Sequence, residues 1–294
     1  MKRLPVHRIL GLGVPLGLLL AGCLVLVVVA TAPGVAASRL GDPLPGEVEA
    51  KVDIKGTKLE DNDADGVLGE DGETGLSGWE IRAYDDLDAN GILSDTAVAA
   101  GPVKTVTTDA SGAYNLAQLA SGAYIVCEVA QTDWIQSYPA YPGSAGSADC
   151  SAGAPLSASG WAVTLGTTDS TGNDFGNWTP ATVSGAKLED ENADGDISED
   201  AGSPLANWTI NAYADDGDGV LSAAEFAAGE VSTRTTGTNG GYSFTLDPGD
   251  YIFCEEAESG WTQSYPGNNI CGAGAGLGAG GWALSLASSD NISN

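Results

Sequence analysis

The chain has 294 residues, of which 40 are acidic and 11 are basic, so its formal net charge is −29 at pH 7. A surface this acidic repels nucleic acids and anionic lipid headgroups and attracts cations. The only histidine is His7, which excludes Ser-His-Asp triads, Cys-His nucleophiles and histidine metal sites from the rest of the chain.

The N-terminus has the pattern of a targeting segment. Three basic residues precede an uncharged run from residue 9 to 32, and small residues before Ser38 suit signal-peptidase cleavage. The run is also long enough for an uncleaved anchor, and Cys23 ends a sequence that resembles a lipoprotein processing site. All three interpretations export the chain. We therefore expect residues 1–37 to be a signal peptide or membrane anchor, residues 38–49 a linker, and the protein to be extracellular, secreted or attached to the cell surface.

One long pattern occurs twice. The sequence GTKLEDNDADG at 56–66 returns as GAKLEDENADG at 185–195. Further segments match in the same order: 79–84 with 208–213, 124–128 with 251–255, 134–139 with 261–266, and 160–163 with 281–284. A period this long indicates tandem domains rather than a solenoid. The predicted domains are residues 50–179 and 180–294.

Within each repeat, short apolar runs alternate with polar residues and are separated by turn-forming residues. Trp79, Ile81 and Ala83, like Tyr124 and Val126, have the period of two that half-buried strands require. Only a weak helical pattern appears, at 223–229. With 43% hydrophobic residues the chain can form packed cores. The fold class predicted is all-β, with two tandem antiparallel Ig-like β-sandwiches.

The acidic loops place an oxygen-bearing side chain at every second residue and close with a glycine, which suits a hard cation such as calcium. The twelfth position of the EF-hand pattern is Gly72 here, so no helix-loop-helix is implied. Solvated acidic turns are the alternative. The candidate ligands in the first domain are Asp61, Asp63, Asp65, the carbonyl of Val67, and Glu70 or Asp71. Those in the second are Asp190, Asn192, Asp194, the carbonyl of Asp196, and Glu199 or Asp200.

A second acidic loop follows each tryptophan-containing strand. In the second domain Ala214 stands where the first ligand belongs, and Asp215 could substitute for it. The candidate ligands are Asp86, Asp88, Asn90 and Asp95 in the first domain, and Asp216, Asp218 and Glu225 in the second.

Four cysteines fall at matching places in the two repeats, one pair in each. In an exported chain this distribution predicts two intradomain disulfides, Cys127 with Cys150 and Cys254 with Cys271, each contributing about 2 to 4 kcal/mol. Free buried thiols are the alternative.

The motif order resembles the serine-aspartate-repeat B-like (SdrD B-like) domains of bacterial surface proteins, within the Cna-B, prealbumin-like group. The motifs carrying it are G-x-K-x-x-D-x-N/D-x-D-G, W-x-I-x-A-Y, G-x-Y-x-x-x-E, W-x-Q-S-Y-P and N-D-F-G-N at 173–177, and they cover nearly all of residues 53–294. The resemblance implies extracellular, rod-like, calcium-binding modules but no ligand. Asn294 aligns with Asn173, so the final strand of the second domain is expected to be missing.

Related Cna-B domains can form a Lys-Asn isopeptide bond promoted by a glutamate on a central strand. Glu128 occupies the matching position, as Glu255 does in the second repeat. The resemblance leaves the partners open between Lys55 and Lys58, and between Asn173 and Asn177. In the second domain only Asn294 would be available.

These observations favour a non-enzymatic, exported cell-surface protein with calcium-stabilised stalk or adhesin modules. The alternatives are a carbohydrate- or protein-binding accessory region of a longer surface protein, and an isopeptide-crosslinked pilin-like subunit. The expected partners are calcium ions and a host or environmental protein or glycan, without nucleic acid, and with membrane contact only through an uncleaved N-terminal segment. Six tryptophans could stack on sugars, although their repeated placement favours core positions: Trp79, Trp134, Trp161, Trp208, Trp261 and Trp282.

Overall fold

The computed structural model describes residues 51–294 except 71, 201 and 294. The predicted targeting segment and linker, residues 1–49, lie outside the described residues. No helix in the described part is long and apolar enough to cross a bilayer. Strands dominate, and no sheet combines strands from before and after residue 179. The division into domains at that position stays a prediction.

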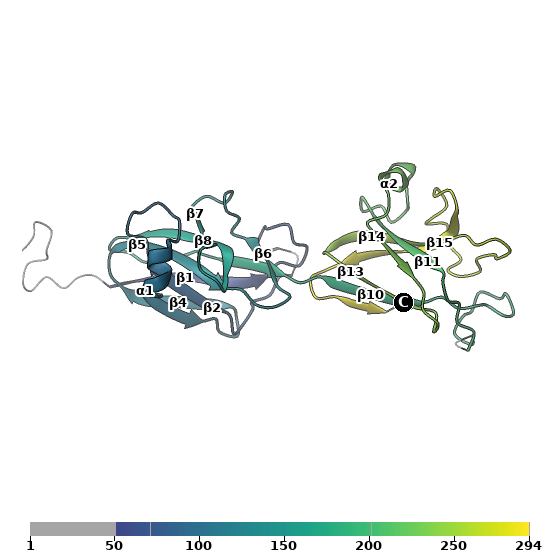
Figure 1. Ribbon diagram of the computed structural model, residues 1–294, viewed down its shortest axis with the longest axis horizontal. Coiled ribbons are helices and arrows are strands. Elements are labelled where there is room, and N and C mark those ends of the chain that lie inside the picture. Colours follow the sequence, from purple (N-terminus) through teal and green to yellow (C-terminus); the bar gives the residue numbers. More distant parts are fainter. Residues whose placement is uncertain (1–50, 71, 201, 294) are drawn as a thin grey trace, which may run out of the picture. The chain divides into compact units, whose positions relative to one another are not determined.

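The first sandwich consists of two sheets with the strand orders β4-β1-β9-β6 and β3-β2-β5-β8-β7 (Figure 1). Every pairing is antiparallel except that of β1 with β9, which is parallel and brings the first and last strands of the sandwich together. Its strands are β1 (Val52–Glu60), β2 (Glu80–Asp85), β3 (Lys104–Thr107), β4 (Ala113–Leu119), β5 (Gly122–Val129), β6 (Ile135–Tyr138), β7 (Ser147–Asp149), β8 (Leu156–Leu165) and β9 (Phe175–Trp178).

Alternation along the strands places one face of each sheet in a shared core. Ile54 of β1, Ile81 of β2 and Val126 of β5 are fully buried in one cluster, which draws residues from both sheets. The predicted period of two is therefore confirmed. The same alternation directs Lys58 and Glu128 into the space between the sheets, because they follow Ile54 and Val126 at even spacing.

The second sandwich repeats this arrangement with sheets β13-β10-β16 and β12-β11-β14-β15. One apolar cluster again joins the sheets, and it includes Val183, Ile210 and Phe244. Its strands are β10 (Ala181–Ala186), β11 (Thr209–Ala214), β12 (Ser232–Thr235), β13 (Gly241–Leu246), β14 (Gly249–Glu256), β15 (Leu277–Leu286) and β16 (Asn291–Ser293).

The two sandwiches differ at two sheet edges. Among the described residues, the larger sheet of the second sandwich lacks a counterpart of β7, and the smaller sheets also differ. β9 lies beside Lys58–Glu60, the last residues of β1, whereas β16 lies beside Thr182–Ser184, in the first half of β10. Among the described residues, the second sandwich has no counterpart of β9 or of its other neighbour, β6.

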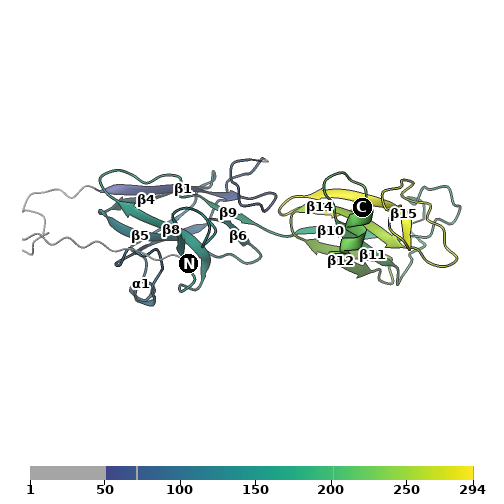
Figure 2. The same ribbon diagram turned by 90° about the horizontal axis from the view of Figure 1, so that it is seen from above.

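Each sandwich has a disulfide and a short helix on the outer side of its larger sheet. Figure 2 shows the helix of the first sandwich below β5. The weak helical pattern at 223–229 is confirmed as α2 (Ala223–Ala228), which begins with a capping box of Ser222 and Glu225. Helix α1 (Asp95–Ala100) was not predicted; it is only six residues long and is capped by Ser94.

Both predicted disulfides are present, with Cα–Cα distances of 6.1 Å for Cys127–Cys150 and 6.0 Å for Cys254–Cys271. The disulfides explain why a glycine lies beside each of them, Gly160 in the first repeat and Gly281 in the second. A Cβ atom at Gly281 would lie 2.2 Å from Cys271 Sγ, and one at Gly160 would lie 2.5 Å from Cys150 Sγ. A side chain at either position would therefore displace the disulfide.

Candidate functional sites

Three polar side chains meet inside the first sandwich. Lys58 comes from β1, Asn177 from the adjacent β9 and Glu128 from β5 in the facing sheet. Lys58 and Glu128 are 0% exposed and Asn177 is 1% exposed. A buried lysine and glutamate are costly unless they are paired, so their position in the core needs a compensating interaction.

The three groups are within reach of one another. Lys58 Nζ donates a hydrogen bond to Asn177 Oδ1 and lies 3.3 Å from Glu128 Oε2. Ser157 Oγ donates to the other carboxyl oxygen, Glu128 Oε1, at 2.8 Å. Lys58 Nζ also lies 4.5 Å from the ring centroid of Trp79. An amine, an amide carbonyl and a carboxyl group therefore share one dry site.

Burial shifts both ionisable groups toward their uncharged forms. Desolvation lowers the pKa of Lys58 to about 8, although the charge of Glu128 opposes this shift. Desolvation also raises the pKa of Glu128, against the effects of Lys58 and Ser157. The 3.3 Å contact is compatible with an ion pair, and the lowered pKa of Lys58 makes the neutral amine accessible near neutral pH. A neutral amine beside an amide carbonyl is a competent nucleophile.

The partners that the resemblance left open are resolved by position. Lys55 is on the surface, where Nζ lies 2.6 Å from Asp169 Oδ2. Asn173 Nδ2 donates to the Lys55 carbonyl at 3.0 Å and to Ser170 Oγ at 3.1 Å. Of the four candidates, only Lys58 and Asn177 lie at the Glu128 carboxyl group.

The second sandwich retains the amine and the acid. Lys187 Nζ lies 2.8 Å from Glu255 Oε2 and 4.9 Å from the ring centroid of Trp208. Both side chains are less buried than in the first sandwich, at 16% and 9% exposure. The predicted partner Asn294 lies outside the described residues.

In the first acidic loop, carboxylate oxygens of Asp61, Asp63 and Asp65 lie within 4.8 Å of one another. Asp61 Oδ2 accepts from Gly66 N at 2.9 Å, but Asp61 Oδ1 is buried without a hydrogen-bond donor. Three carboxylates close together and a buried acceptor without a donor are expected at a cation-binding site.

Glu73 belongs to this loop but was not among the predicted ligands. Its Oε1 is also buried without a donor, while Oε2 accepts from Gly69 N. Burial raises the pKa of Glu73, and the charges of Asp61 and Asp63 add to that effect. In the sequence, Glu73 lies one residue beyond the closing position of the EF-hand pattern when Asp61 is counted as the first position. This spacing could have identified Glu73 as a candidate ligand.

The other ligands proposed for this loop are less clearly placed. The Val67 side chain is exposed, and its amide donates to Asp65 Oδ1 at 2.7 Å. The Glu70 carbonyl accepts from Glu73 N at 3.0 Å. Asp71 lies outside the described residues.

The second acidic loop of the first sandwich is organised by its own backbone. Asp86 is buried and accepts from Gly91 N at 3.0 Å, while Asn90 Nδ2 donates to Asp88 Oδ2 at 2.8 Å. Asp95 lies in the first turn of α1. No three carboxylates of this loop come within 4.8 Å of one another in the described structure.

The first acidic loop of the second sandwich closes in the same way as its counterpart. Asp190 Oδ2 accepts from Gly195 N at 2.9 Å, and Asn192 Nδ2 donates to Glu199 Oε1 at 2.7 Å. Asp200 is buried, and its Oδ2 lacks a donor. The exposed oxygens of this loop bond locally: Asp194 Oδ1 accepts from the amide of Asp196, and Asp196 Oδ1 accepts from the amide of Ser198.

The second loop of the second sandwich brings Asp215 together with Asp216 and Asp218 within 4.8 Å. Asp215 thus occupies the place that Ala214 cannot fill. Glu225 already accepts hydrogen bonds from Asp216 N at 2.8 Å and Ser222 N at 2.7 Å, which support the start of α2.

Most of the repeated tryptophans pack in the apolar cores of the two sandwiches. Trp79, Trp161 and Trp208 are buried, whereas Trp134 and Trp282 are partly buried against the apolar clusters. Trp261 differs, because it is 46% exposed.

No protein-family model and no curated protein matches the sequence. Several solved structures are similar to the chain. The TIE protein of Bacillus anthracis has 16% identity and a TM-score of 0.31, over 83% of this chain and 33% of that one. This chain therefore spans about a third of that protein's length.

Two further similar structures are pilins. The minor pilin GBS52 of Streptococcus agalactiae has 17% identity and a TM-score of 0.30, over 83% of this chain and 93% of that one. The shaft pilin spaA of Lactobacillus rhamnosus GG has 14% identity and a TM-score of 0.31, over 83% and 97%. At these identities and TM-scores, the similarity assigns neither a family nor a function to the chain.

Proposed function

We propose that the chain is a non-enzymatic, exported cell-surface protein, a pilin-like stalk subunit whose first sandwich closes an isopeptide bond between Lys58 and Asn177. The observation that carries this proposal is the fully buried contact of Lys58, Asn177 and Glu128. Removing one partner from such a buried group usually destabilises a protein. A covalent amide removes the ionisable amine from the core, which explains why the core tolerates these residues.

The residues present can perform the reaction. The neutral amine of Lys58 attacks Cγ of Asn177, while the protonated Glu128 carboxyl group stabilises the oxygen on which negative charge develops. Glu128 then relays a proton from the attacking nitrogen to the leaving amide nitrogen. The Nζ–Cγ bond forms, the Cγ–Nδ2 bond breaks and one ammonia leaves, so Glu128 ends in its starting state.

The topology suits a load-bearing stalk. β1 and β9 are the first and last strands of the first sandwich and run parallel to each other. A force applied to the two ends of the sandwich would shear this pair. A bond from Lys58 to Asn177 would carry the load and prevent extension of the intervening chain, which at about 3.4 Å per residue would otherwise lengthen by roughly 400 Å.

The test is peptide mapping by mass spectrometry of the reduced, digested protein. We expect a branched peptide that joins Lys58 to Asn177 and weighs one ammonia less than the sum of its two parts. Asn177→Ala should abolish it, and Asn173→Ala should leave the branched peptide present. Two separate linear peptides from the wild-type protein would refute the proposal.

We also propose that calcium binds the first acidic loop, around Asp61, Asp63, Asp65 and Glu73. The specific support is that Asp61 Oδ1 and Glu73 Oε1 are both buried without donors. Asp61 also belongs to the cluster of three close carboxylates, and the charges of Asp61 and Asp63 act on Glu73. Calcium would supply the charge that these oxygens lack and would couple metal binding to folding.

The test for calcium is thermal unfolding in calcium, in excess chelator, and in magnesium as the ion control. At a calcium concentration of 100 times the Kd, the gain in free energy of unfolding is about 2.7 kcal/mol. A melting temperature unchanged by chelator would contradict the calcium proposal and leave the isopeptide proposal standing.

A further inference from the structure

The first acidic loop of the first sandwich, residues 61–73, is attached to the strand that carries Asn177. Asp61 directly follows β1, and its amide donates to the Asn177 carbonyl at 2.9 Å. This bond continues the parallel pairing of β1 with β9, in which Glu60 is the partner of Asn177. One backbone hydrogen bond therefore joins the residue at the centre of the proposed calcium site to the asparagine that is proposed to react.

The same loop packs on β9 and reaches β6, the strand on the other side of β9. A Cβ atom at Gly176 would lie 2.6 Å from Leu68 Cδ2, so the Leu68 side chain lies directly on the backbone of β9. A Cβ atom at Gly66 would lie 3.3 Å from the carbonyl oxygen of Ser137 in β6. Since β1 and β6 are the two neighbours of β9, the loop meets both strands that flank it.

Three buried oxygen atoms in this part of the sandwich lack hydrogen-bond partners: Asp61 Oδ1, Glu73 Oε1 and Ser137 Oγ. Asp61 itself is 0% exposed. A Cβ atom at Gly176 would lie 3.0 Å from Ser137 Oγ, which places this hydroxyl group against β9. Buried oxygens without partners are costly, so the loop is expected to be fully ordered on β9 only when a cation satisfies its carboxylates.

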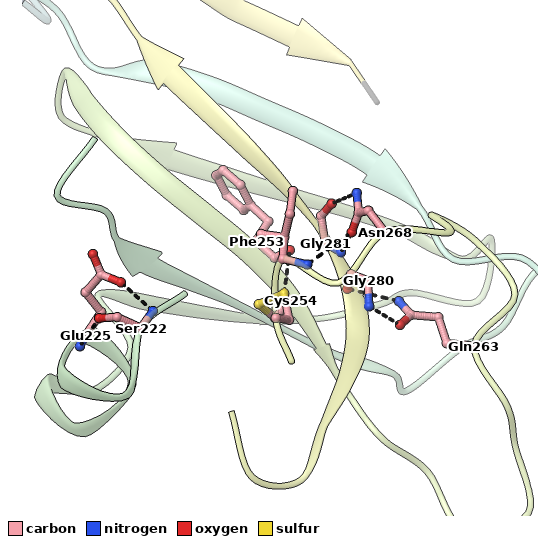
Figure 3. Close-up of a disulfide and its surroundings, with 10 residues drawn as sticks. Ser222, Glu225, Phe253, Cys254, Gln263, Asn268, Gly280 and Gly281 are labelled. Carbon is pink, nitrogen blue, oxygen red and sulfur yellow. Dashed lines mark hydrogen bonds between the residues drawn. A yellow bond between two sulfur atoms is a disulfide. The ribbon is translucent and has the colours of Figure 1, made fainter. Parts of the chain in front are cut away.

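The strand on the far side of β9 is held by its own contacts with the facing sheet. Gln136 of β6 donates to Ser159 O at 3.0 Å and accepts from Ser159 N at 3.0 Å, which ties β6 to β8. The second sandwich has the same arrangement, in which Gln263 donates to Gly280 O at 3.2 Å and accepts from Gly280 N at 2.6 Å (Figure 3). β6 is therefore a fixed wall against which the loop can hold β9.

The proposed bond requires close alignment of its two partners. Lys58 Nζ donates to Asn177 Oδ1, whereas attack requires the nitrogen lone pair to face Cγ of the same side chain. A misplacement of about 1 Å can slow such a step on the order of a hundredfold. A loop that fixes the end of β9 can therefore control how fast the bond forms.

The charge of the loop acts in the same direction. Desolvation lowers the pKa of Lys58 to about 8, and two charged groups oppose this shift, Glu128 from β5 and Asp61 from the loop. The other neighbours of Lys58, Asn177 and the Trp79 ring, are uncharged. A cation bound to Asp61 would offset its negative charge and favour the neutral amine.

We propose that calcium binding at the first acidic loop controls the rate at which the Lys58–Asn177 bond closes, because the ordered loop holds the end of β9 between β1 and β6 and aligns Asn177 for attack. The inference rests on both parts of the proposed function. The chemistry of the step is unchanged: the Nζ–Cγ bond forms, the Cγ–Nδ2 bond breaks, one ammonia leaves, and calcium is not consumed. An exported chain would then crosslink once it reaches a medium that contains calcium.

The test follows bond formation in the full chain, made by cell-free synthesis under oxidising conditions with a calcium-selective chelator. Calcium or additional magnesium is then added, and peptide mapping at timed intervals gives the fraction of branched Lys58–Asn177 peptide. We expect calcium to raise the rate about tenfold or more, and magnesium to leave it unchanged. The acceleration should be lost in Asp61→Asn and in Glu73→Gln. It should be kept in Asp88→Asn, the matched control in the second acidic loop.

A pH profile separates alignment from charge. At about pH 9, above the Lys58 pKa of about 8, the amine is neutral without calcium, so an acceleration that persists there supports alignment by the loop. An acceleration confined to neutral pH would overturn alignment and show that calcium acts only through the charge on Lys58.

The outcomes also separate this inference from the proposals on which it rests. Equal rates in calcium and in chelator would overturn it and leave the bond in place, and a melting temperature that still rises with calcium would leave the calcium site in place as well. Absence of the branched peptide under every condition would refute the bond and the coupling together. If near-ultraviolet circular dichroism shows the calcium-free chain to be unfolded, calcium acts on folding as a whole, and local control by the loop is wrong.

Discussion

Replacement of Glu128 by glutamine tests the proposed bond most directly. Glutamine keeps the shape of the side chain and can still accept the hydrogen bond from Ser157 Oγ, which lies 2.8 Å from Glu128 Oε1. It cannot relay a proton between Lys58 and Asn177. We therefore expect Glu128→Gln to fold without the isopeptide bond and to be less stable than the wild-type protein.

The expected loss can be estimated from the loop that the bond closes. Lys58 and Asn177 are 119 residues apart in sequence. The chain-entropy relation used for cross-links gives a stabilisation of about 5 kcal/mol for a loop of this length. For a domain of roughly 130 residues, with an unfolding entropy of about 2.1 cal/mol/K per residue, this is a decrease of roughly 18 °C in melting temperature.

The assay combines peptide mapping with calorimetry of wild-type and variant proteins under identical conditions. Glu255→Gln is the matched control, because it alters the corresponding residue of the second sandwich, where no described asparagine faces Lys187. It should leave the transition of the first sandwich in place. If Glu128→Gln retains the branched peptide, or if its transition shifts no more than that of the control, the assigned role of Glu128 is wrong.

Four further predictions concern the fold and its ionisable groups. Gly56→Ala should destabilise the first sandwich by about 1 to 3 kcal/mol in urea unfolding, because its Cβ would lie 2.3 Å from Asn173 O, whereas Gly166→Ala, whose Cβ would meet nothing within 4 Å, should be close to neutral. The variant Asn177→Ala cannot form the bond and therefore keeps Lys58 titratable. Burial lowers the pKa of Lys58 to about 8, whereas the ordinary value in an unfolded chain is about 10.4. Between these two pH values the unfolded state binds more protons than the folded state. The free energy of unfolding of this variant should therefore rise with pH from about 8 to about 10.4, by up to about 3 kcal/mol; a flat profile would show that Lys58 is not buried as a neutral amine. Asp61→Asn should weaken calcium-dependent stabilisation in thermal melts, and Asp95→Asn should leave it unchanged, while equal effects would argue against a site centred on Asp61. Reduction of the disulfides, which span 23 and 17 residues, should cost each sandwich about 3 kcal/mol in denaturant titrations, and a loss below 1 kcal/mol in both would contradict the entropic account.

Local patterns in the sequence were sufficient for much of the fold. The period of two places Tyr124, Val126 and Glu128 on one face of β5 whatever the neighbouring strands are. Cys127 and Cys150 of the first repeat match Cys254 and Cys271 of the second, and this correspondence predicted both disulfides. Helix α1 was missed, because six residues contain too little periodicity to distinguish a helix from a loop.

The acidic loops have some features that depend on local sequence and others that depend on packing. Alternating acids identified the cluster of Asp61, Asp63 and Asp65, because the spacing of ligands along a loop is a local property. Glu73 was missed, because only the course of the loop after Gly66 brings its carboxyl group within range of the charges of Asp61 and Asp63. Which carboxyl oxygens lack donors is decided by the packing of the whole loop and cannot be read from spacing.

The sequence by itself determined the repeat, the strand periodicity, the paired cysteines and the inward position of Glu128, because each depends on residues close together in the chain. Tertiary structure alone decided that Lys58 and Asn177, not Lys55 and Asn173, meet Glu128. That choice depends on the register of β1 with β9, which pairs Glu60 with Asn177 across more than a hundred residues.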